Sequence, residues 1–64
     1  MKRYEYCGPV YEFDNLVATK WRGETVANSR ARARTNLAYQ FKMQTNRTAN
    51  TKITVPGQLL EFDI

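Results

Sequence analysis

The sequence predicts one α+β domain, a small antiparallel sheet of three to four strands packed on one helix in the order β-β-β-α-β. Residues 28–44 contain neither Gly nor Pro and are the longest stretch suited to a helix. The residues before them are short aromatic or β-branched segments separated by Gly8-Pro9, Asp14-Asn15 and Gly23. A chain of 64 residues has room for one small domain, which we assign to residues 1–64.

The first predicted strand covers residues 2–7, where Tyr4 and Tyr6 alternate with charged residues. An alternation with a period of two indicates a strand that is buried on one face. Gly8-Pro9 marks a turn or a bulge, so residues 2–13 form either a hairpin or one kinked strand. Residues 10–13 then resume an extended segment in which Tyr11 and Phe13 share a side.

The third predicted strand covers residues 16–22 and is rich in β-branched and aromatic residues. The turn residues Asp14-Asn15 precede it, so we expect it to pair antiparallel with residues 10–13. Trp21, near its end, is expected to lie against the helix.

The helix is predicted over residues 29–45. Asn28 or Ser29 is the N-cap, because a short polar side chain accepts a hydrogen bond from an unpaired amide of the first turn. Asn46 is a suitable left-handed residue just beyond the last turn. Ala33, Leu37 and Phe41 are spaced by four residues and form the stripe that faces the sheet.

A polar loop over 46–51 is expected after the helix, followed by a strand over 52–55 and an extended segment over 58–62 that makes a terminal hairpin possible. Pro56-Gly57 between them predicts a type II turn with the glycine at positive φ.

Several kinds of chemistry are not expected. Histidine is absent and Cys7 is the single cysteine, so the sequence predicts no disulfide and no zinc site. A lone cysteine in a strand is typically a small apolar core residue. The acidic residues are scattered and there is no glycine-rich phosphate loop. We therefore expect no enzyme, no cofactor and no metal.

No run of about eighteen apolar residues is present, and the basic first residues lead into no apolar segment. The sequence therefore predicts a cytoplasmic protein without a membrane partner.

The charge is concentrated in the middle of the chain. Between Lys20 and Lys52 there are eight basic residues and one acidic residue, within a chain of net charge +4. Such a region can neutralise the phosphates of DNA or RNA, although basic surfaces of small domains often serve solubility alone. The candidates for contacts with the nucleic-acid backbone are Arg22, Arg30, Arg32, Lys42 and Arg47. Arg34 falls near the inward stripe of the helix and is interpreted as structural.

The alternative is a protein-interaction module without a role in nucleic-acid binding. Arg32, Tyr39 and Met43 fall on the outward side of the helix and form a mixed basic and apolar strip that fits a protein partner. An ordinary solvated helix face explains the same pattern.

The face of the sheet away from the helix is a further possible site for nucleic acid. Lys2, Arg3, Lys20 and Arg22 are its basic candidates. If Tyr4, Tyr6, Tyr11 and Phe13 fill the helix side, this other face holds Glu5, Glu12, Val17 and Thr19, without aromatic rings on which bases stack.

A family resemblance covers nearly the whole chain. The pattern resembles small uncharacterised proteins of Gram-positive conjugative transposons and prophages, through Tyr6-x-Gly8-Pro9-Val10, Trp21-x-Gly23-Glu24-Thr25-x-Ala27-x-Ser29, Ala33-x-x-Asn36-Leu37-Ala38-Tyr39-Gln40-Phe41-Lys42 and Lys52-Ile53-Thr54-x-Pro56-Gly57. The resemblance implies a bacterial cytoplasm and a mobile genetic element, whose encoded proteins are then possible partners. It implies no activity.

Overall fold

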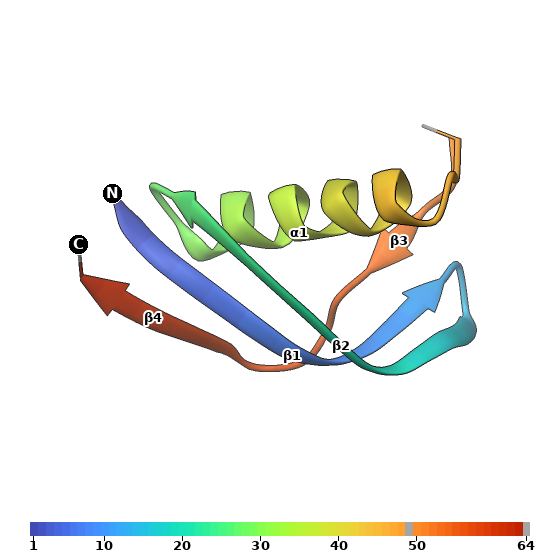
Figure 1. Ribbon diagram of the computed structural model, residues 1–64, viewed down its shortest axis with the longest axis horizontal. Coiled ribbons are helices and arrows are strands. Elements are labelled where there is room, and N and C mark those ends of the chain that lie inside the picture. The colour runs from blue at the N-terminus through green and yellow to red at the C-terminus, as the bar shows by residue number, and fades with distance from the viewer. Residues whose placement is uncertain (49, 64) are drawn as a thin grey trace.

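The computed structural model describes residues 1–48 and 50–63 and confirms an α+β architecture. One layer is a four-stranded antiparallel sheet and the other is a single helix lying across it (Figure 1). The elements of the described chain are β1 (Lys2–Glu12), β2 (Asn15–Ala27), α1 (Arg30–Gln44), β3 (Ile53–Thr54) and β4 (Leu59–Asp63). The order is therefore β-β-α-β-β, and the predicted order β-β-β-α-β was wrong.

The first two predicted strands are one strand. β1 runs through Gly8-Pro9, where its pairing with β2 shifts register on both sides of Val10. Proline has no N–H to donate to a strand partner, so the ladder is interrupted there while the strand itself continues as a kinked strand. Of the two alternatives for residues 2–13, the kinked strand is the one observed.

β2 is longer than the predicted strand 16–22, because Gly23 does not end it. Gly23 pairs with Tyr6 and the strand continues to Ala27. A Cβ atom on Gly23 would lie 2.5 Å from Cη2 of Trp21, so glycine gives the indole ring the space that it needs. Gly23 is therefore required for the packing of the indole ring and does not form a turn.

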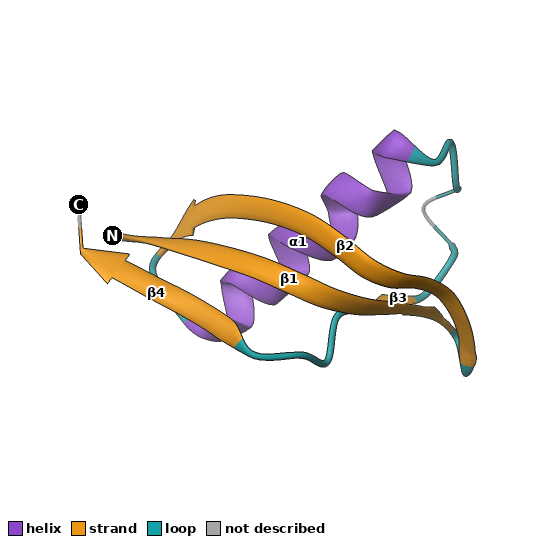
Figure 2. Ribbon diagram, turned by 60° about the horizontal axis from the view of Figure 1, so that its bottom comes forward, coloured by secondary structure: helices purple, strands orange, loops and turns teal. Residues whose placement is uncertain are grey.

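β1 is the central strand of the sheet. β2 pairs along one side of it, while β4 pairs with Lys2–Tyr6 and β3 pairs with Tyr11 and Glu12 on the other side. β3 and β4 therefore share one edge of β1 and do not form a terminal hairpin with each other (Figure 2).

Two predicted turns were wrong. The hairpin between β1 and β2 turns at Phe13 and Asp14, since Glu12 already pairs with Asn15. Phe13 has φ 55°, its N–H donates to the carbonyl of Lys52 at 2.9 Å, and its ring is more than half exposed instead of facing the helix. Val10 is buried instead of Phe13, because it continues the series of even-numbered residues, Tyr4 and Tyr6, whose side chains point to the helix.

Gly57 does not have the positive φ of the predicted type II turn. A Cβ atom at Gly57 would lie 2.8 Å from the hydroxyl oxygen of Tyr6. Close approach to a ring is therefore the reason for a glycine at this position. The predicted loop 46–51 contains residue 49, which lies outside the described residues.

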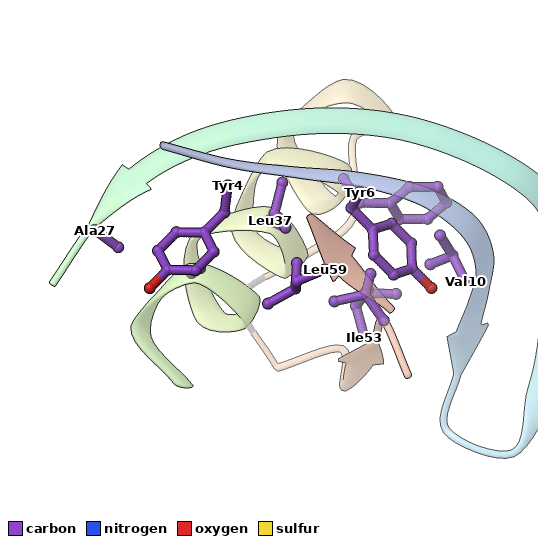
Figure 3. Packing of buried hydrophobic residues seen from close by; sticks show 10 residues of the cluster. Tyr4, Tyr6, Val10, Ala27, Leu37, Ile53 and Leu59 are labelled. Carbon is purple, nitrogen blue, oxygen red and sulfur yellow. The ribbon is translucent and has the colours of Figure 1, made fainter. Parts of the chain in front are cut away.

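The helix is confirmed in place and orientation. Ser29 is its N-cap, with Oγ accepting from the N–H of Arg32 at 3.2 Å, and Asn46 is left-handed with φ 57°. Ala33, Leu37 and Phe41 are buried as predicted. Figure 3 shows Leu37 among the side chains that fill the space between sheet and helix; the buried cluster consists of Tyr4, Tyr6, Val10, Ala27, Ala33, Leu37, Phe41, Ile53, Val55 and Leu59.

Trp21 packs on the helix, as expected. Its ring meets Phe41 edge-on with 5.5 Å between the ring centroids, and its Nε1 donates to Oε1 of Gln44 at 3.1 Å. This contact fastens the middle of β2 to the last turns of α1.

Candidate functional site

Two of the five arginines and lysines predicted to contact nucleic acid are held in ion pairs. Nε of Arg30 lies 3.3 Å from Oε1 of Glu61, and Nη2 of Arg47 lies 3.3 Å from Oε1 of Glu12. The Arg47 guanidinium also lies 5.2 Å from the centroid of the Phe41 ring. These two side chains connect α1 and the segment after it to the sheet.

Arg34 has a structural role, as interpreted from its place on the helix. Its Nη1 donates to the carbonyls of Val55 and Gly57, the latter at 2.8 Å. A charged donor that satisfies two backbone acceptors fixes the path of the chain between β3 and β4. The Arg34 guanidinium therefore makes its hydrogen bonds within the protein.

The remaining basic candidates lie on different surfaces. Arg22 extends from β2 opposite Cys7, on the side of the sheet away from α1, whereas Arg32 is exposed on α1. Lys42 is partly buried beside a shallow groove of about 400 Å³ between α1 and β3. The structure does not bring the five predicted residues together into one basic surface.

The outward strip of the helix is present. Tyr39 and Met43 lie one turn apart and are 62% and 61% exposed, and Arg32 lies two turns before Tyr39. Tyr39 also lines the groove between α1 and β3. The strip is narrow, because the neighbouring helix positions are polar or buried.

A broader surface lies on the sheet, on the side opposite α1, and we call it the open face. No element of the described chain covers it (Figure 2). It is formed by alternate residues of the strands and by their partners in register, namely Arg3, Glu5, Cys7 and Tyr11 of β1, Leu16, Lys20, Arg22, Glu24 and Val26 of β2, Thr54 of β3, and Leu60 and Phe62 of β4.

The open face exposes large apolar side chains at one end. Val26, Leu60 and Phe62 are 45%, 53% and 39% exposed. The Arg3 guanidinium stacks on Phe62 at 4.9 Å from its centroid. An antiparallel sheet with one face in water normally carries polar residues on that face, so these three side chains depart from the usual pattern.

The composition expected for this face was partly wrong. Glu5 is there, but Glu12 points to the helix side and pairs with Arg47, and Val17 packs against the core. Tyr11 and Phe62 instead place aromatic rings on this face. The signal in the sequence was the pair Leu59-Leu60, because two neighbouring strand residues face opposite sides and one leucine had to point outward.

Cys7 is exposed on the open face and is not the core residue that a lone cysteine usually is. It lines a shallow hollow of about 470 Å³ together with Arg22, Glu24 and Leu60. The middle of the open face is therefore slightly concave at this hollow.

The open face has more basic than acidic side chains. Its bases are Arg3, Lys20 and Arg22 and its acids are Glu5 and Glu24, in a protein of net charge +4. Nη2 of Arg3 lies 3.3 Å from Oε2 of Glu5. Glu24 stands directly opposite Glu5 in the pairing register, and no described side chain gives Glu24 or Arg22 an ion pair.

The strand that supplies Leu60 and Phe62 is held by ion pairs at its other face. Nζ of Lys2 lies 2.7 Å from Oε2 of Glu61, which also meets Arg30. The hydrogen bond from Lys2 lowers the pKa of Glu61, and the bond to Glu61 raises the pKa of Lys2. These contacts keep β4 beside β1 and thereby place two apolar residues on the open face.

Within residues 1–48 and 50–63, no three cysteine or acidic side chains lie close enough together to hold a metal ion. No helix in that part of the chain is long and apolar enough to cross a membrane. Comparison with protein-family models, with curated proteins and with solved structures finds no match to this chain. The resemblance to proteins of mobile elements therefore stays a prediction.

Proposed function

We propose that this protein is a small protein-interaction module of the bacterial cytoplasm and that the open face of its sheet is the binding surface. The observation that carries the proposal is the exposure of three apolar side chains at one end of the open face. Val26 and Phe62 lie on either side of Arg3 in register, and Leu60 lies two residues before Phe62 on β4. Apolar side chains surrounded by charged ones are the usual composition of a protein-binding surface.

The arrangement of the basic side chains favours this function over nucleic-acid binding. Arg30 and Arg47 are paired with acids, and Arg34 holds two backbone carbonyls. Binding to a nucleic-acid backbone gains its affinity from several cations that reach phosphates together. The basic candidates of this protein are divided between the helix, the segment after it and the open face of the sheet.

Sequence-independent binding of DNA or RNA is the second candidate function. Arg22 and Arg32 favour it, because both are exposed and no described acid pairs with either of them. A fluorescence titration at about 50 mM salt tests it, and binding should weaken steeply as salt rises. Absence of affinity for both DNA and RNA at that salt contradicts this candidate.

The interaction module is tested by capture from nuclease-treated lysate of the source bacterium. Leu60→Lys places a charge on the open face, and Met43→Lys places the same charge on the helix strip at a similar exposure. We expect the wild type and Met43→Lys to retain the same protein and Leu60→Lys to lose it. Loss of the protein with Met43→Lys alone would assign binding to the strip of Arg32, Tyr39 and Met43 instead.

A further inference from the structure

We propose that the groove between α1 and β3 binds an extended, acidic segment of a partner protein, which adds a strand to the outer edge of β3. One wall of the groove is the stripe of α1 from Arg34 to Lys42, and the other is the chain from Lys52 to Pro56. None of the three exposed apolar residues that carry the proposed function lines this groove. The inference therefore goes beyond that function and does not rest on it.

The inner edge of β3 is paired with β1. The N–H of Phe13 donates to the carbonyl of Lys52 at 2.9 Å, and Thr54 pairs in register with Tyr11. Neighbouring residues of a strand direct their backbone N–H and C=O groups to opposite edges. The N–H and C=O of Ile53 therefore point away from β1, on the side of the groove that this residue lines.

Val55 follows the same alternation as Ile53. Its carbonyl accepts a hydrogen bond from Nη1 of Arg34 on α1, as expected for a group that points away from β1. The N–H and C=O of Ile53 and the N–H of Val55 have no hydrogen-bond partner among the described residues. An extended segment laid beside β3 would satisfy these three groups, which is the usual way in which a peptide binds to an exposed sheet edge.

The groove has the dimensions of a short extended segment. Arg34 and Lys42 are eight residues apart on α1, a length of about 12 Å along the helix. The chain from Lys52 to Pro56 covers about 13 Å when extended, so roughly four residues of a partner strand fit along both walls. Tyr39 lines the same groove and is 62% exposed, which offers an aromatic ring to a side chain of the partner.

The charge of the groove selects an acidic segment. Three basic side chains line it, Arg34, Lys42 and Lys52, and none of its lining residues is acidic. Lys52 is exposed, and no ion pair joins it to a described acid, including Asp14, with which it lines a separate hollow. Since Arg34 is already bonded to two carbonyls at one end, we expect an acidic side chain of the partner to meet Lys52 at the other end.

Fluorescence anisotropy with a labelled octapeptide of alternating glutamate and valine tests the proposal. We expect this peptide to bind with a Kd below about 1 mM, and the matching peptide of lysine and valine not to bind in that range. Valine favours the extended conformation that strand addition requires.

Two charge reversals separate the groove from the net charge of the protein. Lys52→Glu should weaken binding of the glutamate peptide at least about fivefold. Lys20→Glu is the matched control, because Lys20 is also an exposed lysine, lies outside the groove and gives the same change in net charge. It should leave binding within about twofold of the wild type. Thermal unfolding verifies that both variants are folded.

Strand addition has two measurements of its own. N-methylation of either the valine or the glutamate amides removes the donors from one edge of the peptide. One of these two peptides should therefore bind at least about fivefold more weakly, and the other should bind like the parent. In the complex, the amide hydrogen of Ile53 should exchange with solvent more slowly, as measured by NMR, while amides of β4 keep their rates.

Absence of binding at about 1 mM overturns the proposal. Equal weakening by Lys52→Glu and Lys20→Glu overturns it too, because attraction to the net charge alone would explain the binding. Equal affinity of the two N-methylated peptides, with unchanged exchange at Ile53, overturns strand addition. A single-stranded oligonucleotide that displaces the peptide and loses affinity in Lys52→Glu alone would assign the groove to a nucleic-acid backbone instead.

The variant Leu60→Lys keeps this test distinct from that of the open face. It should leave peptide binding unchanged, because Leu60 does not line the groove. Loss of the peptide in Leu60→Lys would contradict the groove as its binding site. Loss of capture from lysate in Leu60→Lys concerns the open face alone.

Discussion

The hydroxyl oxygen of Tyr6 accepts a hydrogen bond from the backbone N–H of Gly57 at 2.9 Å. The same hydroxyl donates to the carbonyl of Pro9, so one side chain on the central strand joins the kink of β1 to the segment between β3 and β4. The ring occupies the space that a side chain at position 57 would need.

We expect Tyr6→Phe to lower the free energy of unfolding by about 1–3 kcal/mol, because a partly buried N–H and carbonyl lose their partner. Gly57→Ala should also destabilise the protein, since its Cβ would lie 2.8 Å from the hydroxyl oxygen. Urea unfolding of both single variants and the double variant measures their coupling. The penalty for Gly57→Ala should be smaller when the hydroxyl is absent, and strict additivity would show that the two residues do not interact.

Arg34→Ala should cost about 1–3 kcal/mol of stability, because the carbonyls of Val55 and Gly57 then lose a charged donor. Arg32→Ala is the matched control, since it removes the same side chain from the same helix at an exposed position where no side-chain bond is made to the sheet. Thermal unfolding compares the two. Equal losses would contradict the structural role of Arg34.

Gly23→Ala should displace the indole of Trp21, because the added Cβ would lie 2.5 Å from that ring and 3.0 Å from Cδ2 of Leu37. Overpacking of this kind typically costs about 1–3 kcal/mol. Trp21 is the single tryptophan, so its fluorescence reports the change directly. Glu24→Ala at the next, exposed position serves as the control, and an emission spectrum that is the same in all three proteins would contradict the close packing.

Stability should depend on pH through Lys2 and Glu61. The pKa of Glu61 is lowered from 4.5 by Lys2, so its contribution is present above 4.5 and is lost as the pH falls through the lowered pKa. The pKa of Lys2 is raised from 10.5, so its contribution is present below 10.5 and is lost as the pH rises through the raised pKa. The effect should be small and weakened by salt, because the pair lies at the surface.

Thermal unfolding of the wild type and of Glu61→Gln, measured at a series of pH values, checks this dependence. The difference between the two proteins should be greatest between the two pH limits and should shrink at low pH. A difference that stays constant down to the most acidic condition would contradict the role assigned to the carboxylate.

The helix could be predicted from the sequence because its signals are local. Ser29 caps it, Asn46 ends it, and the spacing of Ala33, Leu37 and Phe41 selects the buried face; each of these effects acts within a few residues. The contact of Trp21 with the helix could be predicted in the same way. A large aromatic ring near the apolar stripe of the helix is buried by packing against that stripe, and Trp21 does so at Phe41.

The turns and the strand order could not be predicted, because glycine and proline have more than one structural use. Gly23 and Gly57 were expected at breaks in the chain, but both make room for a ring that comes from elsewhere in the sequence. Gly8-Pro9 bends β1 without ending it. The ion pairs of two candidate basic residues could not be predicted for a similar reason, since Arg30 and Arg47 meet acids that are 31 and 35 residues away.

The sequence by itself determined one capped helix, its buried stripe and the alternation of β1, because these depend on propensity and on periods of 3.6 and 2 residues. The tertiary structure alone decided that β1 is central, that β3 and β4 share its edge, and that no described element covers the other side of the sheet. Long-range pairing sets these features, and a shift of one residue in register would turn Leu60 and Phe62 inward. The open face, and with it the proposed function, is therefore a property of the assembled sheet.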